Sequence, residues 1–474
     1  QQGAPEVRNG VRGNISLGLR KPDEPISLKK GEVDKGFAQA DEVFEDVFET
    51  QRVNQVALEP HLVCCWPEVG NRLAVLSTTQ SIFGLRARLS ESLGLPLSTF
   101  RVIRPSLGGA FGKGPDMISN EALCAFATLR LGRPVRIENT HQEEFTRSAR
   151  HPSRIFVKTG VKKDGSLTAR QMKAWMDIGA SANHGPSVVM VGGSVFVGAY
   201  KTAHYLFEGF SVYTNNFPSG AMRGYGAVQT NYAVECHMDR IVCEMGFDPF
   251  EFRIQNVYRA GEISPLTDLP IRSSSLRECG MRARELIGWD NDASRTSHAS
   301  NYKVGLGLAF CGMKNTGVHT GKKLPAKVVE FCGAIVKINE DGSVHLNVAA
   351  IEQGCGQATV LSQIVADVLG TSIDNVLVVP TDSDSAPFDA PTHASRITFA
   401  AGYSVRLAAM DAREKILEVA GHLLGEDSEN LGVREERVFS LKSPDTFITL
   451  RKVAEHYHYN QMRSILGKAT SPPP

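Results

Sequence analysis

Residues 153–179, SRIFVKTGVKKDGSLTARQMKAWMDIG, decide the fold class of this chain. Two long runs rich in β-branched and apolar residues flank an Asp-Gly pair at 164–165, which favours the tight turn of an antiparallel hairpin. The same design recurs in residues 333–350, GAIVKINEDGSVHLNVAA, with its Asp-Gly pair at 341–342. A glycine-containing stretch and a helical pattern follow each hairpin, which predicts an α+β fold with two elongated mixed domains.

Three further elements support a mixed architecture. Residues 61–80 carry two apolar, β-branched runs around a Gly-Asn turn and predict another hairpin. Residues 81–95 have the apolar spacing of a helix that ends at Gly94. Residues 119–132 predict a helix with a Ser/Asn cap, an early Glu121 and a terminal glycine.

The length of 474 residues predicts two to four domains, at roughly 150 residues per domain. The chain begins with Gln and ends in a polar, Pro-rich tail, so we expect a piece of a longer protein. We place the main boundary in a stretch rich in Gly, Pro and Ser. The expected parts are 1–24 (end of a preceding domain, or linker), 25–260 (first domain), 261–275 (linker) and 276–474 (second domain, incomplete, its C-terminal part missing).

Composition excludes several classes of function. Because 52 Lys and Arg residues balance 51 Asp and Glu residues, we expect no nucleic-acid partner. The most apolar stretch, residues 186–200, is too short and too interrupted by glycine to cross a bilayer, so we expect no membrane span. The nine cysteines form no CxxC pair, which argues against a disulfide framework, a zinc ribbon or an iron–sulfur ligand set. A reducing cytoplasm is the expected location.

Residues 106–114, SLGGAFGKG, lie between an apolar run and a helical pattern, as a phosphate-binding loop does. The nucleotide-binding P-loop requires Gly, four residues, and then Gly-Lys-Ser/Thr. Leu107 stands at its first glycine position and Gly114 at its hydroxyl position, so this loop type is excluded. The four glycines still allow the backbone to approach a ligand closely and to adopt positive φ.

Four stretches of this kind follow strand-like residues, and most of them precede helix-like ones. Such loops expose backbone N–H groups and helix N-termini, which suit phosphate and other anionic groups. Four in one chain predict a large, extended anionic ligand held from several sides, although each loop alone is consistent with a tight turn. The stretches are 106–114, 219–229, 351–360 and 389–398.

Two other constellations fail as metal sites. Asp382, Asp384 and Asp389 resemble a calcium loop, but proline occupies the turn position that needs glycine, and histidine the last position, which needs glutamate. His456 and His458 alternate as they would on a strand, without a third ligand nearby. We therefore expect that no side chain of this chain binds a metal directly.

Together these stretches resemble the molybdopterin-binding portion of the xanthine dehydrogenase family of molybdenum hydroxylases. The pattern is more similar to nicotinate dehydrogenase and other bacterial split-subunit enzymes than to the animal xanthine enzyme. The resemblance implies two molybdopterin-binding domains of the aldehyde oxidase/xanthine dehydrogenase type. The segments that carry it are LEPHLVCCWPE (58–68), STTQ (77–80), SLGGAFGKG (106–114), residues 120–154, YTNNFPSGAMRGYGAVQ (213–229), IEQGCGQATVLSQIVADVLG (351–370) and APTHASRITFAAG (390–402).

The resemblance gives the SLGGAFGKG loop a role beside the metal. Gly109, Phe111 and Gly112 match cofactor-binding positions, and Phe111 also matches a catalytic position that contacts the substrate. Gln80 matches a catalytic glutamine that hydrogen-bonds the oxo ligand of the metal. The alternative for Gln80 is an exposed glutamine in a turn.

Three residues of the stretch 219–229 match cofactor or substrate positions. Arg223 matches a catalytic, cofactor-binding arginine near the dithiolene end of the pterin, where its five fixed donors suit ring and phosphate acceptors. The alternative for Arg223 is a surface ion pair. Tyr225 stands where the family often has Phe and would place an aromatic face against a flat substrate, unless it is a core aromatic. Gln229 matches a pterin contact.

Further cofactor contacts are implied by two later stretches. Gly354, Cys355 and Gln357 lie where the family commonly has a Gly-Gln-Gly motif, with Cys355 in place of the glutamine. It stays open whether Cys355 or Gln357 makes the contact, and Cys355 as inert packing is the alternative. The loop that wraps the cofactor phosphates in the family matches Thr392, Ala394 and Ser395.

The implied cofactor is molybdopterin, in its cytosine dinucleotide form, with molybdenum. FAD and iron–sulfur clusters would lie on partner chains, namely a flavin subunit and an iron–sulfur subunit. The family's general base is a Glu near the C-terminus of the subunit, and we find no match for it before Pro474. We therefore expect either a second molybdopterin subunit that supplies it or a truncated chain, and in both cases no activity of 1–474 alone.

The implied reaction hydroxylates an electron-poor carbon with water-derived oxygen and passes electrons to the partners. Two differences from the animal enzyme argue against xanthine: residues 115–116 lack its Glu, and no Arg lies near residues 193–194. N-heteroaromatic rings, aldehydes and aryl thioesters remain, and we favour the first. The alternative function is a non-catalytic scaffold or assembly homologue that has lost the cofactor.

Overall fold

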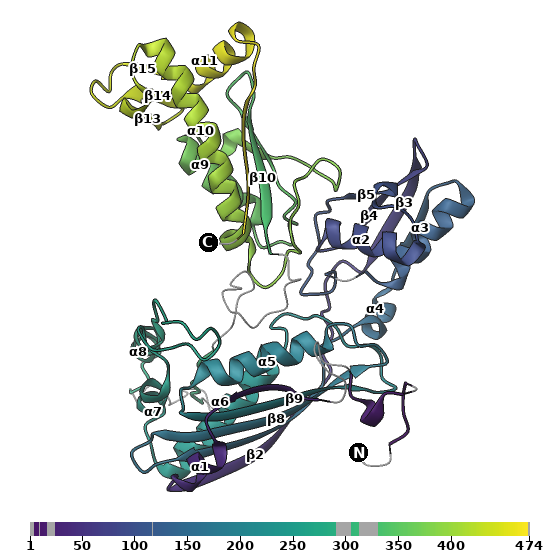
Figure 1. Cartoon of the computed structure of the whole chain (residues 1–474), viewed down its shortest axis with the longest axis vertical. Coiled ribbons are helices and arrows are strands. Elements are labelled where there is room, and N and C mark those ends of the chain that lie inside the picture. Colours follow the sequence, from purple (N-terminus) through teal and green to yellow (C-terminus); the bar gives the residue numbers. More distant parts are fainter. Residues whose placement is uncertain are drawn as a thin grey trace, which may run out of the picture. The chain divides into compact units, whose positions relative to one another are not determined.

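The computed structural model describes residues 4–8, 10–16, 24–115, 117–290, 305–311 and 330–472, which form two compact units (Figure 1). Unit 1 comprises residues 1–55, 145–314 and 320–323, and unit 2 comprises 56–144, 315–319 and 324–474. The chain therefore leaves unit 1, builds part of unit 2, and returns before it completes unit 2. The domain boundaries expected from sequence stay a prediction.

Unit 1 is built on a five-stranded sheet with the order β1-β9-β8-β7-β2. The predicted hairpin is confirmed as β7 and β8, because the Asp164 carboxylate accepts hydrogen bonds from the Ser166 amide (2.9 Å) and hydroxyl (2.6 Å) at the turn. The strands are β1 (Ile26–Lys30), β2 (Glu42–Thr50), β7 (Ser153–Val161), β8 (Leu167–Gly179) and β9 (His204–Tyr213).

One face of this sheet carries α5 (Gly185–Ala199) and α6 (Ala227–Met245), as Figure 1 shows. The apolar stretch 186–200 therefore forms a buried helix. Gly193 lets α5 approach the sheet closely, since a Cβ there would lie 2.6 Å from ring carbons of Phe207. The core of unit 1 lies between these helices and the strands.

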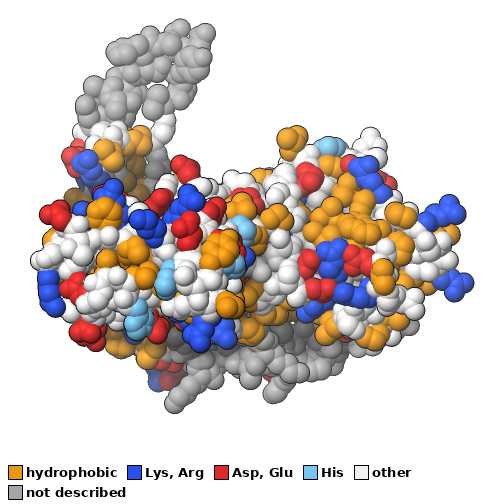
Figure 2. All heavy atoms as spheres, turned by 90° about the horizontal axis from the view of Figure 1, so that it is seen from above, with side chains coloured by type: hydrophobic (Ala, Val, Ile, Leu, Met, Phe, Trp, Pro, Cys, Tyr) orange, Lys and Arg blue, Asp and Glu red, His pale blue; other side chains and the backbone are white. Residues whose placement is uncertain are grey.

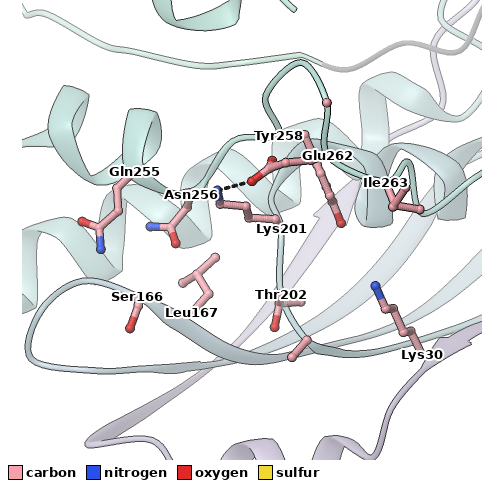
Figure 3. Close-up of a pocket in the computed structure, with 12 residues that line it drawn as sticks. Lys30, Ser166, Leu167, Lys201, Thr202, Gln255, Asn256, Tyr258, Glu262 and Ile263 are labelled. Carbon is pink, nitrogen blue, oxygen red and sulfur yellow. Dashed lines mark hydrogen bonds and ion pairs between the residues drawn. The ribbon is translucent and has the colours of Figure 1, made fainter. Parts of the chain in front are cut away.

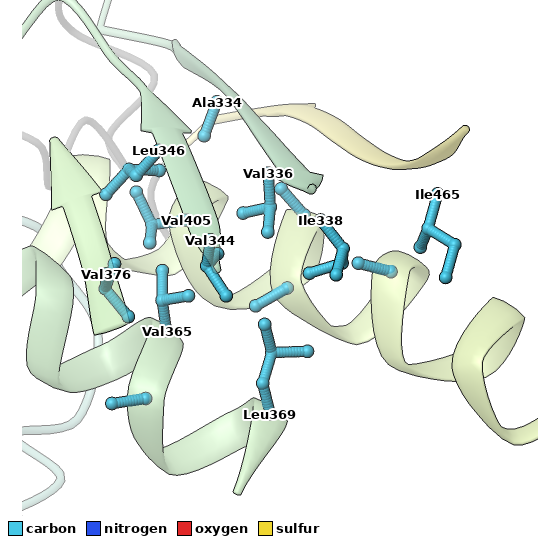
Figure 4. Close-up of a cluster of buried hydrophobic side chains, with 14 of the residues drawn as sticks. Ala334, Val336, Ile338, Val344, Leu346, Val365, Leu369, Val376, Val405 and Ile465 are labelled. Atoms are coloured by element: carbon cyan, nitrogen blue, oxygen red, sulfur yellow. The ribbon is translucent and has the colours of Figure 1, made fainter. Parts of the chain in front are cut away.

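The first layer of unit 2 is a sheet with the order β12-β11-β10-β16, covered by α9 and α10. The hairpin predicted over 333–350 is confirmed as β10 and β11. In Figure 4, Val336 and Val344 of this hairpin point toward Val365 of α9 and Val405 of α10. The elements are β10 (Cys332–Ile338), β11 (Val344–Asn347), β12 (Val376–Val378), β16 (Ile465–Ser471), α9 (Gln357–Leu369) and α10 (Gly402–Leu424).

Unit 2 also contains a separate sheet with the order β5-β4-β3-β6, which packs against α2 and α3. The hairpin predicted over 61–80 is confirmed as β3 and β4. The predicted helix over 81–95 is confirmed as α2, which ends at Gly94 in the left-handed conformation. The elements are β3 (Leu62–Glu68), β4 (Arg72–Ser77), β5 (Phe100–Ile103), β6 (Val135–Glu138), α2 (Ile82–Leu93) and α3 (Ser119–Leu131).

The helix predicted over 119–132 is confirmed as α3, but its predicted Ser/Asn cap is wrong. The capping position is Ile118, whose side chain has no oxygen. The Glu121 carboxylate instead accepts a hydrogen bond from the Ile118 amide (2.9 Å). A glutamate in the first turn thus satisfies an N-terminal amide without a capping hydroxyl.

The remaining elements are short. They are α1 (Val33–Ala38), α4 (His141–Arg147), α7 (Pro249–Asn256), α8 (Leu276–Leu286), α11 (Leu450–Glu455), β13 (Leu431–Arg434), β14 (Arg437–Ser440) and β15 (Phe447–Thr449), with 3₁₀ turns at Arg12–Asn14, Leu97–Thr99, Ile373–Asn375 and Ser428–Asn430 and π-helical turns at Ile397–Ala401 and His456–Asn460.

The surface carries both signs of charge. Figure 2 shows acidic and basic side chains interspersed on the face in view, beside a cluster of hydrophobic side chains. In the part of the chain that the structure describes, no helix has the length and hydrophobicity that a membrane span needs. All nine cysteines are free thiols.

Candidate functional site

Three of the four predicted loops meet in unit 2, and Thr392 joins them. The Thr392 carbonyl oxygen accepts hydrogen bonds from Gln80 Nε2 (2.8 Å) and from Gln353 Nε2 (2.7 Å). The Thr392 amide donates to the Gln80 carbonyl oxygen (2.9 Å), and the Thr392 hydroxyl accepts from the Ile351 amide (2.9 Å). One buried residue therefore links its own loop to the segments that carry Gln80 and Gln353.

The SLGGAFGKG loop joins the same junction through Gln80. The Gly114 amide donates to Gln80 Oε1 (3.1 Å), and the Gln80 amide donates to the Gly114 carbonyl oxygen (2.7 Å). A Cβ at Gly114 would lie 2.5 Å from the Thr78 carbonyl oxygen, so the close approach requires glycine. Because only 3% of Gln80 is exposed, the alternative of an exposed turn glutamine is wrong.

The predicted contact residues of these loops lie in strained backbone. Phe111 has φ 52°, between Gly109 (φ 95°) and Gly112 (φ 96°), and its side chain is 43% exposed. Ala394 and Ser395 have φ 48° and 55°. A left-handed conformation disfavours residues with a Cβ, and such strain concentrates at binding and active sites. These three residues therefore share a left-handed conformation at positions predicted to contact the cofactor.

A buried cation lies at the base of the loop 389–398. Arg396 is fully buried, and its guanidinium donates to Asp389 (2.8 Å), to Glu330 (3.0 Å) and to Cys332 Sγ (2.7 Å). Burial raises the pKa of Asp389, although the nearby Arg396 opposes that change. The cluster fixes the end of the loop just after Ser395.

The amides at the start of α9 already have an anionic partner in this chain. The Glu352 carboxylate accepts hydrogen bonds from the amides of Gly354 (2.8 Å), Gly356 (3.2 Å) and Ala358 (3.0 Å). Burial raises the pKa of Glu352, but these hydrogen bonds outweigh it and hold the pKa below its ordinary value. Three of the N–H donors expected of the loop 351–360 are thus already used within the chain.

Cys355 is exposed, so the alternative that it is inert packing is wrong. It lies between Gly354 and Gly356, and a Cβ at either glycine would meet no atom within 4 Å. The side chain of Gln357 is already engaged within the loop, because its Oε1 accepts a hydrogen bond from the Gln353 amide (3.4 Å). Of the two candidates for the cofactor contact, Cys355 has the open surroundings.

The fourth loop, residues 219–229, lies in unit 1 and leads into α6. Arg223 is exposed, and among the described residues it forms no ion pair, so nothing supports the surface ion pair as its role. The Arg223 carbonyl oxygen accepts a hydrogen bond from the Arg150 guanidinium (2.7 Å). Tyr225 is half-buried and has φ 47°, the same strained conformation as Phe111.

Gln229 is 2% exposed and lies in the first turn of α6. Its Nε2 donates to the His151 carbonyl oxygen (3.2 Å), whereas its Oε1 has no hydrogen-bond partner among the described residues. An unsatisfied buried acceptor is costly, and one in a native structure indicates a missing donor.

His151 predicts a pH dependence of stability. Burial, and then the charges of His184 and Arg52, lower its pKa to about 3. In the unfolded chain this histidine has the ordinary pKa of about 6.5. Between about pH 3 and 6.5, His151 is therefore protonated in the unfolded chain but not in the folded chain. Stability should fall as the pH decreases from 6.5.

Replacing His151 by Gln should reduce the dependence of the unfolding free energy on pH near pH 5 by about 1.4 kcal/mol per pH unit. The exposed His141→Gln is the matched control, and urea denaturation between pH 5 and 7.5 measures both. Equal slopes for the His151 variant and the wild type would contradict the assignment.

The acidic residues that resembled a calcium loop are neutralised by arginine. Asp382 accepts from Arg101 (2.8 Å), and Asp384 pairs with Arg72. Asp389 belongs to the buried Arg396 cluster described above. In the part of the chain that the structure describes, no group of three His, Cys, Asp or Glu side chains could hold a metal ion.

The strand expected at His456 and His458 is wrong, because residues 456–460 form a π-helical turn that continues α11. The apolar residues of α11 are buried in unit 2, so the segment just before His456 is helical, and the chain continues as a helical turn rather than as a strand. His458 Nε2 lies 3.3 Å from Glu340. Asp116, which entered the argument against xanthine, lies outside the described residues.

A surface cleft of about 600 Å³ opens in unit 1, away from every predicted residue (Figure 3). Lys201 at its wall is neutralised by Glu262 at 2.8 Å, and burial raises the pKa of Tyr258 to about 12. Lys30 adds a second cation. None of the residues predicted to bind cofactor or substrate lines this cleft.

Two family models, each described as a molybdopterin cofactor-binding domain, match residues 19–257 and 282–471. The chain is 31% identical over 459 residues to the putative xanthine dehydrogenase molybdenum-binding subunit XdhA of Escherichia coli K12. That alignment covers 94% of this chain and 60% of XdhA. The chain belongs to the xanthine dehydrogenase family. The resemblance stated above, to its molybdopterin-binding subunit, is thereby confirmed.

A second curated relative and a solved structure extend the comparison. The large molybdopterin subunit of nicotinate dehydrogenase from Eubacterium barkeri is 34% identical over 259 residues, which are 54% of this chain and 61% of that protein. The crystal structure of quinoline 2-oxidoreductase from Pseudomonas putida 86 matches with a TM-score of 0.88 at 24% identity, over 100% of this chain and 61% of that one. The predicted α+β fold is thereby confirmed. The chain spans about 60% of the length of these two curated relatives and 41% of that of the probable hypoxanthine oxidase XdhD of Escherichia coli K12.

The residues present fit the molybdopterin of the xanthine dehydrogenase family. In unit 2, a Cβ at Gly354 or Gly356 would meet no atom within 4 Å, so the backbone there is open to a ligand. The strained Ala394 and Ser395 turn the backbone of the loop predicted to wrap the phosphates. When bound, the cofactor with its molybdenum supplies the redox centre that accepts electrons from a substrate.

Proposed function

We propose that this chain is the molybdopterin-binding subunit of a molybdenum hydroxylase that adds water-derived oxygen to an electron-poor carbon of an N-heteroaromatic ring. The observation that carries the proposal is the junction at Thr392. Gln80, Gln353 and the SLGGAFGKG loop meet there, next to backbone that is strained at Phe111. Preorganised loops of this kind hold a ligand without rearrangement.

Each matched residue has a proposed role. Gln80, Phe111 and Arg223 act in catalysis, and Phe111 and Tyr225 contact the substrate. An aromatic ring that is partly exposed offers a face to a flat heterocycle. The proposed cofactor contacts are Gly109, Phe111, Gly112, Arg223, Gln229, Gly354, Cys355, Gln357, Thr392, Ala394 and Ser395.

The proposed assembly contains further chains. A second molybdopterin subunit would supply the general base, and separate subunits would carry the iron–sulfur clusters and FAD. Two relatives support a multi-subunit enzyme by their names, the nicotine 6-hydroxylase large subunit and the gamma subunit of the 6-hydroxypseudooxynicotine dehydrogenase complex, both from Paenarthrobacter nicotinovorans. We also propose the cytosine dinucleotide form of the cofactor and a cytoplasmic location.

Metal analysis tests the proposal. The chain is purified with the chains that copurify with it, and molybdenum and released cytidine monophosphate are measured per polypeptide. We expect one molybdenum and one cytidine monophosphate, and incorporation of ¹⁸O from labelled water into quinoline or nicotinate. Absence of both molybdenum and pterin would overturn the proposal in favour of a non-catalytic scaffold.

A further inference from the structure

The hydroxyl of Tyr225 is held by two residues at the N-terminus of α5, the capping residue and one of the first turn. His184, at the capping position of α5, contacts the Tyr225 hydroxyl through Nδ1, and Ser187 Oγ lies 2.7 Å from it. The His184 and Tyr225 rings meet edge to face, with centroids 5.3 Å apart and an interplanar angle of 80°. The tyrosine is thus fixed at its hydroxyl end by a neighbouring helix.

The hydrogen atoms of this group can be assigned by counting. Ser187 Oγ lies 2.9 Å from the His184 carbonyl oxygen, which can only accept, so the single Ser187 hydrogen goes there. Ser187 Oγ then accepts the hydrogen of the Tyr225 hydroxyl. Because the Tyr225 hydrogen is used, the contact with His184 requires a hydrogen on His184 Nδ1.

The backbone around Tyr225 needs such support. Tyr225 has φ 47° between Gly224 (φ 95°) and Gly226 (φ 93°), three successive residues in positive-φ backbone. A Cβ at Gly226 would lie 2.2 Å from the Val188 carbonyl oxygen, so this turn packs directly on α5. A strained residue persists only where its surroundings determine its conformation.

We propose that His184 and Ser187 are positioning residues that fix the ring of Tyr225 for an aromatic substrate. The inference rests on the proposed function and deepens it. Because Ser187 and His184 hold the Tyr225 hydroxyl, the ring is the part of this side chain that we assign to a substrate. The site therefore favours flat aromatic rings over small aliphatic aldehydes.

The test uses a donor swap at His184 in the complex purified with its partner chains. His184→Asn keeps an N–H donor near the position of Nδ1, and His184→Leu removes it. His422→Leu is the matched control, because it makes the same exchange at an exposed histidine of α10 that belongs to none of the proposed contacts. KM and kcat are measured with quinoline as the aromatic probe and propionaldehyde as the aliphatic one.

We expect His184→Leu to raise KM for quinoline about 3- to 10-fold, the range that an aromatic contact provides, and to leave propionaldehyde unchanged. His184→Asn and His422→Leu should stay within about twofold of the wild type. Equal impairment by Asn and Leu, or equal effects on both probes, would overturn the proposal. Equal impairment by both variants would exclude a donor role of His184, and equal effects on both probes would indicate a merely structural role.

A second readout separates this inference from the proposed function. In the chain labelled with ¹³C-tyrosine, the Tyr225 signals are assigned by their loss in Tyr225→Phe. In His184→Leu, the Tyr225 signals should change position, and those of the two sides of the ring should become equal because the ring rotates freely. In His184→Asn, the Tyr225 signals should stay as in the wild type. A wild-type complex that contains molybdenum but converts no aromatic probe contradicts the proposed function, and unchanged Tyr225 signals in His184→Leu contradict the positioning role.

Discussion

Replacing Arg396 by methionine should lower the free energy of unfolding by about 3–5 kcal/mol, the cost of removing one partner of a buried ion pair. The variant leaves Asp389, whose side chain is 1% exposed, and Glu330 without their cation. Urea denaturation of the full chain measures the loss. Because Arg396 directly follows Ser395, we also expect the loop of the proposed cofactor contacts to lose its fixed geometry.

Two further variants separate charge from packing. Asp389→Asn combined with Arg396→Met removes both the carboxylate charge and its partner, so it should be more stable than Arg396→Met alone. Arg451→Met removes an exposed ion pair with Glu455 and should leave the free energy of unfolding close to that of the wild type. A cost for Arg396→Met as small as that for Arg451→Met would refute the view that this cluster anchors the loop.

The elements that follow local rules could be predicted from the sequence. Asp-Gly pairs gave both long hairpins, and Gly94 ended its helix, because turn and cap chemistry depends on residues a few positions apart. His456 and His458 show the limit. Their alternation suggests a strand, but packing of the preceding residues of α11 extends a helix through them, and tertiary context outweighs a two-residue pattern.

For the candidate site, too, the sequence identified individual residues but not the contacts between residues that are far apart in the chain. The motifs identified Gln80 and Thr392, but no local rule shows that the two residues exchange hydrogen bonds across 312 positions of sequence. Glu352 was missed although its signal is local, an acidic residue two positions before a Gly-x-Gly turn at a helix start. His184 and Arg396 carry no such signal, because their partners become visible only once the chain is folded.

Replacing Phe111 by glycine should separate stability from activity. Glycine adopts φ 52° without the cost of roughly 1–2 kcal/mol that a Cβ brings, and the ring is 43% exposed. The unfolding free energy should therefore stay within about 1 kcal/mol of the wild type. Loss of the ring should lower kcat/KM for quinoline by about 30- to 100-fold, or about 2–3 kcal/mol of transition-state stabilisation.

Asn71→Gly is the matched control for Phe111→Gly. Asn71 also has a positive φ, 57°, but it lies in the turn between β3 and β4 and belongs to none of the proposed contacts. It should relieve strain and leave kcat/KM unchanged. If Phe111→Gly, with molybdenum bound, kept full activity, the strain at Phe111 would need another explanation. A loss of activity at unchanged stability would mean that the ring held in this strained conformation serves the ligand, because folding itself does not require the ring.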